Sequence, residues 1–130
     1  MGRFHAYVKY LLGNFLIKWR YRNDFVVDVA VVALETMTAC NLKCRYCPNF
    51  YTERSSAVNS QRMNEKYVYK VIDELAQISY HGALSLSLYN EPLLDERLPD
   101  FYRYASQKLP AAYLMVYTNG ELLDEQKYKG

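Results

Sequence analysis

All three cysteines of this 130-residue chain lie in one short segment, TACNLKCRYCPNF at 38–50. Cys40, Cys44 and Cys47 have the spacing Cys-x3-Cys-x2-Cys. A structural zinc site uses four protein ligands, and a disulfide framework uses an even number of cysteines. Three clustered thiols therefore indicate a metal centre with one open coordination position, and they favour a reducing compartment.

The composition is that of an ordinary globular protein. Apolar residues make up 51% of the chain and charged residues 23%, and no linker of low complexity divides it. The net charge of +2 is too small to indicate a nucleic-acid partner. The N-terminal segment lacks the apolar region and cleavage site of a signal peptide, so we expect a cytoplasmic protein.

Residues 1–25 have the pattern of an amphipathic helical extension. Apolar residues recur at helical spacing at Phe4, Tyr7, Val8, Leu11, Leu12, Phe15, Leu16 and Trp19. Lysine and arginine residues supply the polar side. We expect this helix to dock on the domain behind it; contact with a membrane surface is the alternative, because basic amphipathic helices with aromatic residues bind there.

The remainder, residues 26–130, alternates between strand and helix patterns and is expected to form one domain. The apolar run at 29–34 is typical of a strand buried on both faces. A second strand is predicted within 83–92, with Leu84, Leu86 and Leu88 on one face and Ser85 and Ser87 on the other. A third is predicted at 112–117. The two serines either leave room for a cofactor or serve packing.

Two helices are predicted between these strands. The first begins near Asn64, a favoured N-cap residue, and Gly82 is its expected C-terminal stop. Its buried stripe is expected to be Val68, Val71, Ile72, Leu75 and Ile78. The second begins near Pro99 and ends before Pro110. A further helix is expected to start within 122–128. This β/α order predicts parallel strands, in a β/α barrel or an open sheet.

An unusual motif follows each predicted strand. The first strand precedes the cysteine segment, the second precedes YNEP at 89–92, and the third precedes TNG at 118–120. Because the carboxyl ends of parallel strands meet at one edge of a sheet, we expect these motifs to form one site.

Three thiolates at this edge are compatible with more than one kind of metal centre. An iron–sulfur cube normally takes four cysteine ligands, so three leave one iron open. Zinc with a histidine (His5 or His81) or water as fourth ligand is an alternative, and cysteines without metal are another.

The segment CNLKCRYC resembles the signature of the radical S-adenosylmethionine (radical SAM) enzymes, Cys-x3-Cys-x-aromatic-Cys, with Tyr46 at the aromatic position. The resemblance covers roughly residues 29–130. It implies that Cys40, Cys44 and Cys47 bind a 4Fe-4S cluster, and that S-adenosylmethionine chelates the fourth iron through its amino and carboxylate groups.

The resemblance extends to the other two motifs. YNEP is similar to the Gly-Gly-Glu-Pro of the family, whose acidic residue holds the methionine amino group, although Tyr89 and Asn90 replace both glycines. A carboxylate can hold the ammonium group of the methionine part through a charge-assisted hydrogen bond. The residues that the resemblance assigns to cofactor binding are Tyr46, Asn90, Glu91, Thr118 and Asn119.

The implied activity is reductive cleavage of S-adenosylmethionine to a 5′-deoxyadenosyl radical, which abstracts a hydrogen atom from the substrate. The implied partner is an external electron donor of the flavodoxin or ferredoxin type. The substrate is unknown, and the CPN sequence beside the cluster is similar to radical SAM proteins that modify peptides.

The family fold is a partial barrel of six β/α units, which at about 30 residues a unit needs roughly 190 residues. This sequence supplies about three units, so we expect the first half of such a domain. Two other functions stay open: a non-enzymatic iron–sulfur or zinc module, and a membrane-associated interaction protein built on the N-terminal helix.

Overall fold

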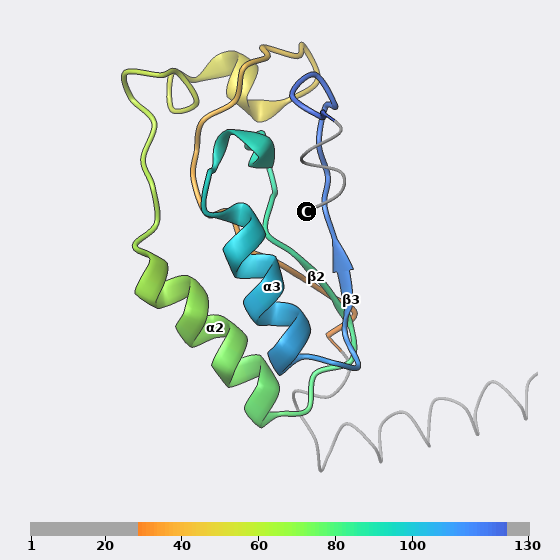
Figure 1. The fold of residues 1–130 in the computed structure, drawn as a ribbon. Coiled ribbons are helices and arrows are strands. Elements are labelled where there is room, and N and C mark those ends of the chain that lie inside the picture. The colour runs from red at the N-terminus through yellow and green to blue at the C-terminus, as the bar shows by residue number, and fades with distance from the viewer. Residues whose placement is uncertain (1–28, 125–130) are drawn as a thin grey trace, which may run out of the picture.

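The computed structural model describes residues 29–124 and is a three-stranded parallel sheet with two α-helices on one side (Figure 1). The elements in chain order are β1 (Val31–Ala33), the 3-10 turn η1 (Pro48–Tyr51), α2 (Glu65–Gln77), β2 (Ala83–Ser85), the 3-10 turn η2 (Pro92–Leu94), α3 (Leu98–Lys108) and β3 (Tyr113–Met115). The predicted β/α order and parallel pairing are confirmed. The helix predicted at 1–25 lies outside the described residues, as does most of the one predicted after 121.

The sheet has the order β1-β2-β3, so β2 is its central strand. Val31, Val32 and Ala33 pair with Ala83, Leu84 and Ser85. The prediction that the first strand is buried on both faces is wrong for the described residues: Val31 is 52% exposed, while Val32 packs against the core. The reason is that β1 forms an edge of the sheet and the helices of the described part cover only one face.

The central strand alternates as predicted over its first residues. Leu84 and Leu86 are fully buried against the helices. Ser85 and Ser87 are also buried, and their hydroxyl oxygens lie 2.9 Å apart within hydrogen-bonding distance. Leu88, which the alternation places on the same face as Leu84 and Leu86, is instead 55% exposed. Regular strand geometry ends at Ser85, and the chain then turns into the loop that follows.

Helix α2 begins where the sequence predicts and ends earlier. The Asn64 side chain accepts a hydrogen bond from the Lys66 N–H at 3.1 Å, which confirms the N-cap. The helix stops at Gln77 because the chain takes a left-handed conformation at Ser79, with φ 52°. Ile78 is consequently exposed, contrary to prediction.

Gly82 is not the C-terminal stop that the sequence suggests, and it serves a different purpose. An added Cβ at this position would lie 2.4 Å from the Tyr80 hydroxyl and 2.6 Å from the Val29 carbonyl oxygen. A side chain at Gly82 would therefore separate two segments that pack at the start of the sheet.

Helix α3 closes the core against the sheet. Pro99 lies in its first turn, as predicted. The Tyr102 hydroxyl accepts from the Leu86 N–H at 3.0 Å and donates to the Met115 carbonyl, so it joins β2 and β3 at the point where their pairing ends. The buried core consists of Val68, Ile72, Leu84, Leu86, Leu98, Phe101, Ala105 and Leu109. No helix within residues 29–124 is long and apolar enough to cross a bilayer.

A buried ion pair joins the segments that lead to the carboxyl edge of the sheet. The Asp95 carboxylate accepts bonds of 2.8 Å from the Arg97 guanidinium and a bond of 2.9 Å from the Thr36 hydroxyl. Arg97 also donates to the Met63 carbonyl at 2.9 Å. This cluster connects the exit of β1, the approach to α2 and the start of α3, and the Asp95 side chain is fully buried.

We predict that Asp95→Asn lowers the free energy of unfolding by roughly 3 kcal/mol, because it leaves Arg97 without its counter-charge. The matched control is Asp100→Asn, which removes a charge from the exposed ion pair with Arg103 and should leave the unfolding midpoint nearly unchanged. Chemical denaturation monitored by circular dichroism measures both. Equal effects of the two substitutions would contradict the structural role of Asp95.

The same comparison has a pH signature. Burial raises the pKa of the Asp95 carboxyl, but the hydrogen bonds from Arg97 and Thr36 outweigh it, so the pKa lies below its usual value. The stabilisation is therefore present above the unfolded pKa of about 3.9 and is lost as the pH falls through the lower folded pKa. The difference in stability between wild type and Asp95→Asn should accordingly shrink below about pH 4.

Candidate functional site

The loops that follow the three strands gather at one edge of the sheet (Figure 1). They are the cysteine loop after β1, the YNEP loop after β2 and the TNG turn after β3. The prediction that the three motifs share one edge is confirmed, since hydrogen bonds join each loop to at least one other. The geometry of the site follows from these bonds.

The cysteine loop is closed by its own backbone. The Cys47 N–H donates to the Cys44 carbonyl at 2.9 Å and Pro48 then starts η1, so the last two cysteines share a tight turn. The Cys40 N–H donates to the Ser55 carbonyl at 3.1 Å. The Lys43 ammonium donates to the Thr52 carbonyl at 2.8 Å, which ties the middle of the loop to the end of η1.

The three thiols are half-buried, free and electrostatically coupled. Burial raises the pKa of the Cys40 thiol, and the negative charges of Glu91, Cys47 and Cys44 raise it further. Four groups that carry negative charge when ionised therefore gather at this edge. A cation bound beside Cys40 would oppose this effect, because a nearby positive charge favours the thiolate.

Between residues 29 and 124, no group of three histidine, cysteine, aspartate or glutamate side chains is placed to hold one metal ion. A zinc ion requires such convergence, whereas in an iron–sulfur cube each thiolate binds a different iron. The donor set of three thiolates suits an iron–sulfur cluster with one open iron.

Glu91 joins all three loops. Its side chain is 1% exposed, so the carboxylate is buried and not solvated. The carboxylate accepts from the Thr118 hydroxyl at 2.6 Å and from the Asn119 N–H at 2.8 Å. It also caps η2 by accepting from the Leu93 N–H at 3.0 Å. The Glu91 backbone N–H donates to the Ala39 carbonyl, directly before the first cysteine, at 2.9 Å.

A second connection runs between the cysteine loop and the turn after β3. The Asn119 side chain donates to the Asn41 amide oxygen at 2.9 Å, and Asn41 donates to the Glu121 carboxylate at 2.9 Å. Sequence reasoning missed Asn41 and Glu121. The position of Asn41 directly after Cys40 was the available signal, but its partner lies 78 residues away.

The YNEP loop lacks the two glycines of the family pattern. Ser79 is the only non-glycine residue with positive φ in the described part of the chain, so Tyr89 and Asn90 adopt ordinary conformations. The Tyr89 N–H donates to the Glu35 carboxylate at 3.2 Å, and its carbonyl accepts from the Asn49 amide at 2.7 Å. Side chains from elsewhere therefore hold the backbone of this loop.

The other predicted site residues are placed unequally. The structure brings Thr118 and Asn119 into contact with Glu91. Asn90 is buried beside Glu91, and its amide oxygen accepts from the Leu88 N–H at 3.0 Å. Tyr46 is instead 91% exposed, and hydrogen bonding with Cys44 raises the pKa of its hydroxyl. Tyr46 therefore lies beside the Cys44 thiol, on the exposed side of the cysteine loop.

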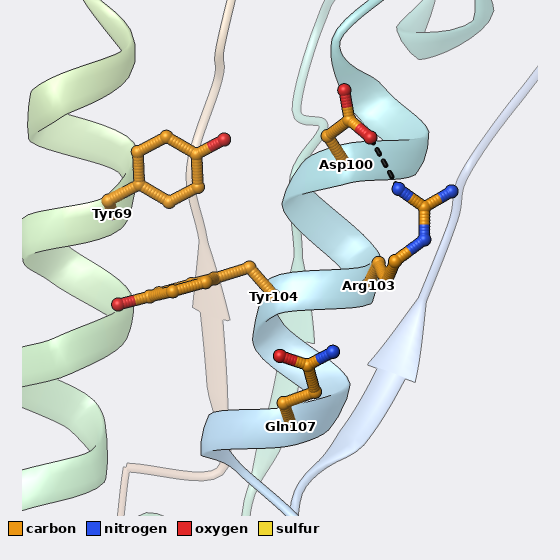
Figure 2. A pocket seen from close by; sticks show the side chains of 5 residues that line it. All are labelled: Tyr69, Asp100, Arg103, Tyr104 and Gln107. Carbon is orange, nitrogen blue, oxygen red and sulfur yellow. Dashed lines mark hydrogen bonds and ion pairs between the residues drawn. The ribbon is translucent and has the colours of Figure 1, made fainter.

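A surface hollow lies elsewhere, between α2 and α3 (Figure 2). It is lined by Tyr69, Asp100, Arg103, Tyr104 and Gln107. The rings of Tyr69 and Tyr104 meet edge to face, with 4.9 Å between their centroids. None of these residues belongs to the three loops, so the hollow is separate from the candidate site.

Comparisons with known proteins agree with this geometry. A family model described as the radical SAM superfamily matches residues 34–129. The chain is 29% identical over 98 residues to the S-adenosyl-L-methionine-dependent 2-deoxy-scyllo-inosamine dehydrogenase of Niallia circulans. The alignment includes 75% of this chain and 38% of that protein.

Two solved structures are similar in fold. BtrN in complex with AdoMet and 2-DOIA has a TM-score of 0.67 at 31% sequence identity, over 77% of this chain and 39% of that chain. BtrN in an open conformation has a TM-score of 0.64 at 31% identity, over 77% of this chain and 43% of that chain. The chain thus spans about two fifths of the length of these relatives.

The matched region begins directly after β1 and contains every later element from η1 to β3, together with the three loops of the site. Proteins of the matched family use a 4Fe-4S cluster and S-adenosylmethionine. The motifs, their assembly at one edge of a parallel sheet and the family match agree, and the chain belongs to the radical SAM superfamily.

Proposed function

We propose that this chain is the first half of the core domain of a radical SAM enzyme. In this proposal Cys40, Cys44 and Cys47 hold a 4Fe-4S cluster, and Glu91 holds the amino group of S-adenosylmethionine. The observation that carries the proposal is the buried Glu91 carboxylate, which joins the YNEP loop to the TNG turn while its backbone is bonded next to Cys40.

The side chains of the site suit both the 4Fe-4S cluster and the amino group of S-adenosylmethionine. Thiolates are the usual ligands of an iron–sulfur cluster, and three of them leave an iron for S-adenosylmethionine. A carboxylate offers about four acceptor positions. Among the contacts of the described residues, Oε1 of Glu91 accepts two hydrogen bonds and Oε2 accepts one. A further position on Oε2 therefore suits an ammonium donor.

The residues of this chain bind and orient, and the cofactors supply the difficult chemistry. When bound, the reduced cluster and S-adenosylmethionine together supply a 5′-deoxyadenosyl radical for hydrogen abstraction. Thr118 and the Asn119 backbone fix the rotation of the Glu91 carboxylate. Burial of Glu91 keeps water from its ammonium partner, which strengthens the ion pair.

For the substrate, the electron donor and the rest of the fold, the relatives and the sequence support predictions only. Similarity to an inosamine dehydrogenase favours a substrate carbon that carries a hydroxyl group. The peptide substrate suggested by CPN, the flavodoxin- or ferredoxin-type donor and the cytoplasmic location stay predictions. We propose that the sheet is the first part of a partial barrel whose remaining strands lie beyond the region that this chain shares with its relatives.

The first test is the identity of the metal centre. We predict that anaerobic reconstitution of the chain gives about four iron and four sulfide per protein molecule. Cys44→Ser should lose most of this iron, whereas Ser55→Ala, which alters a hydroxyl in the same loop, should retain it. One equivalent of zinc without sulfide would instead support the alternative of a non-enzymatic zinc module.

The second test concerns Glu91. We predict that Glu91→Gln weakens binding of S-adenosylmethionine to the reconstituted chain by at least about tenfold, because a charge-assisted hydrogen bond is lost. Equilibrium dialysis with labelled S-adenosylmethionine measures the affinity. Glu121→Gln is the matched control: this carboxylate is exposed at the same edge, and glutamine can still accept the bond from Asn41.

The iron content of both variants is measured beside the affinity. The proposal requires that Glu91→Gln retains its iron and loses affinity. Unchanged affinity in Glu91→Gln, at wild-type iron content, would show that the carboxylate does not face the cofactor.

A further inference from the structure

Asn49 lies two residues after the last cysteine, and neither the family signature nor the sequence pattern gives it a role. Its side chain is buried within η1. The Asn49 amide nitrogen donates to the Tyr89 carbonyl oxygen at 2.7 Å, across 40 residues of sequence. This is a direct side-chain bond between the cysteine loop and the loop that carries Glu91.

The amide oxygen of Asn49, unlike its amide nitrogen, makes no contact of this kind within residues 29–124. This oxygen is buried and has no hydrogen-bond partner in the described part of the chain. Burying an unpaired acceptor costs free energy, and a leucine of similar shape would avoid that cost. A buried asparagine with only half of its amide paired is therefore a poor choice for packing. The presence of asparagine at position 49 needs another explanation, and its hydrogen bond to Tyr89 offers one.

The neighbouring contacts supply that explanation. The Tyr89 N–H is bonded to the Glu35 carboxylate, and the Glu91 N–H to the Ala39 carbonyl. Together with Asn49, these bonds hold the YNEP backbone at three points within three residues. The family pattern has two glycines in this loop, whereas this chain has side chains there and uses external hydrogen bonds to define the backbone.

We propose that Asn49 is a positioning residue that holds the Glu91 loop against the cysteine loop, and so sets the separation between the Glu91 carboxylate and the thiolates. The part of this proposal that concerns S-adenosylmethionine rests on the proposed function. The loop geometry itself does not, and it can be measured in the chain without cofactors.

The test is Asn49→Leu in the full chain, with Asn59→Leu as control because Asn59 is an exposed asparagine of the same loop. Amide hydrogen exchange in the metal-free protein should become at least about tenfold faster at Tyr89 and Glu91, since the partly buried hydrogen bond to the Tyr89 carbonyl is lost. Exchange in α3 and the melting temperature should stay near wild type. A merely structural role would instead speed exchange throughout and lower the melting temperature.

The reconstituted protein gives the second readout. Asn49→Leu should keep its iron content and bind S-adenosylmethionine about tenfold more weakly, in the range expected for one lost hydrogen bond. If the wild type does not bind S-adenosylmethionine, the proposed function fails while the exchange result still decides the role of Asn49. Unchanged exchange at Tyr89 and Glu91 in a folded Asn49→Leu variant would overturn the positioning role.

A measurement on the wild type covers the case in which Asn49→Leu does not fold. The side-chain amide protons of Asn49 and Asn59 can be compared by NMR in the same sample. The bond to Tyr89 predicts slow exchange for Asn49 and fast exchange for Asn59. Equal rates would contradict the proposal without any substitution.

Discussion

The buried carboxylate of Glu91 is the interaction on which the arrangement of the site depends. Three donors from two loops share this one side chain, and its own backbone N–H is bonded beside the first cysteine. A buried carboxylate without hydrogen-bond partners would be strongly unfavourable, and the loops after β2 and β3 supply the partners of Glu91. The requirement to satisfy this carboxylate therefore also brings the binding loops together.

The polar contacts form two levels above the sheet. Nearest the sheet, Asp95 and Arg97 connect the segments that leave β1 and enter the two helices. Further out, Glu91, Asn41 and Asn49 connect the loops themselves. The lower level stabilises the fold, since its ion pair is buried and joins regular elements. In the proposed function the upper level sets the distances between the cysteines and Glu91, so its loss is expected to affect binding more than stability.

Local chemistry accounts for what the sequence predicted well. The Asn64 cap, the turn at Pro99 and the alternation of Leu84 and Leu86 depend on neighbours a few residues away. The position of the motifs after each strand then follows from parallel pairing. The differences have equally physical causes, because periodicity alone does not show where a chain turns. Ile78 was assigned to a buried stripe that it does not reach, and Leu88 is exposed although it continues the alternation of Leu84 and Leu86.

The parts of the site that escaped prediction involve long separations in sequence. Asn41 meets Asn119 across 78 residues, and Glu35 meets Tyr89 across 54. Such pairs depend on the register of the strands and on the path of each loop, which no local pattern encodes. The apolar run of β1 shows the same limit, because it is compatible with a central strand and with an edge strand.

The central claim is that the three loops in this chain suffice to form an open-iron site for S-adenosylmethionine. The most direct test is the EPR spectrum of the anaerobically reconstituted and reduced chain, recorded with and without S-adenosylmethionine. The account predicts a cluster signal whose g values change when the cofactor is added. A cluster signal that stays the same at saturating cofactor would contradict it, and would show that the binding site requires strands beyond those of this chain.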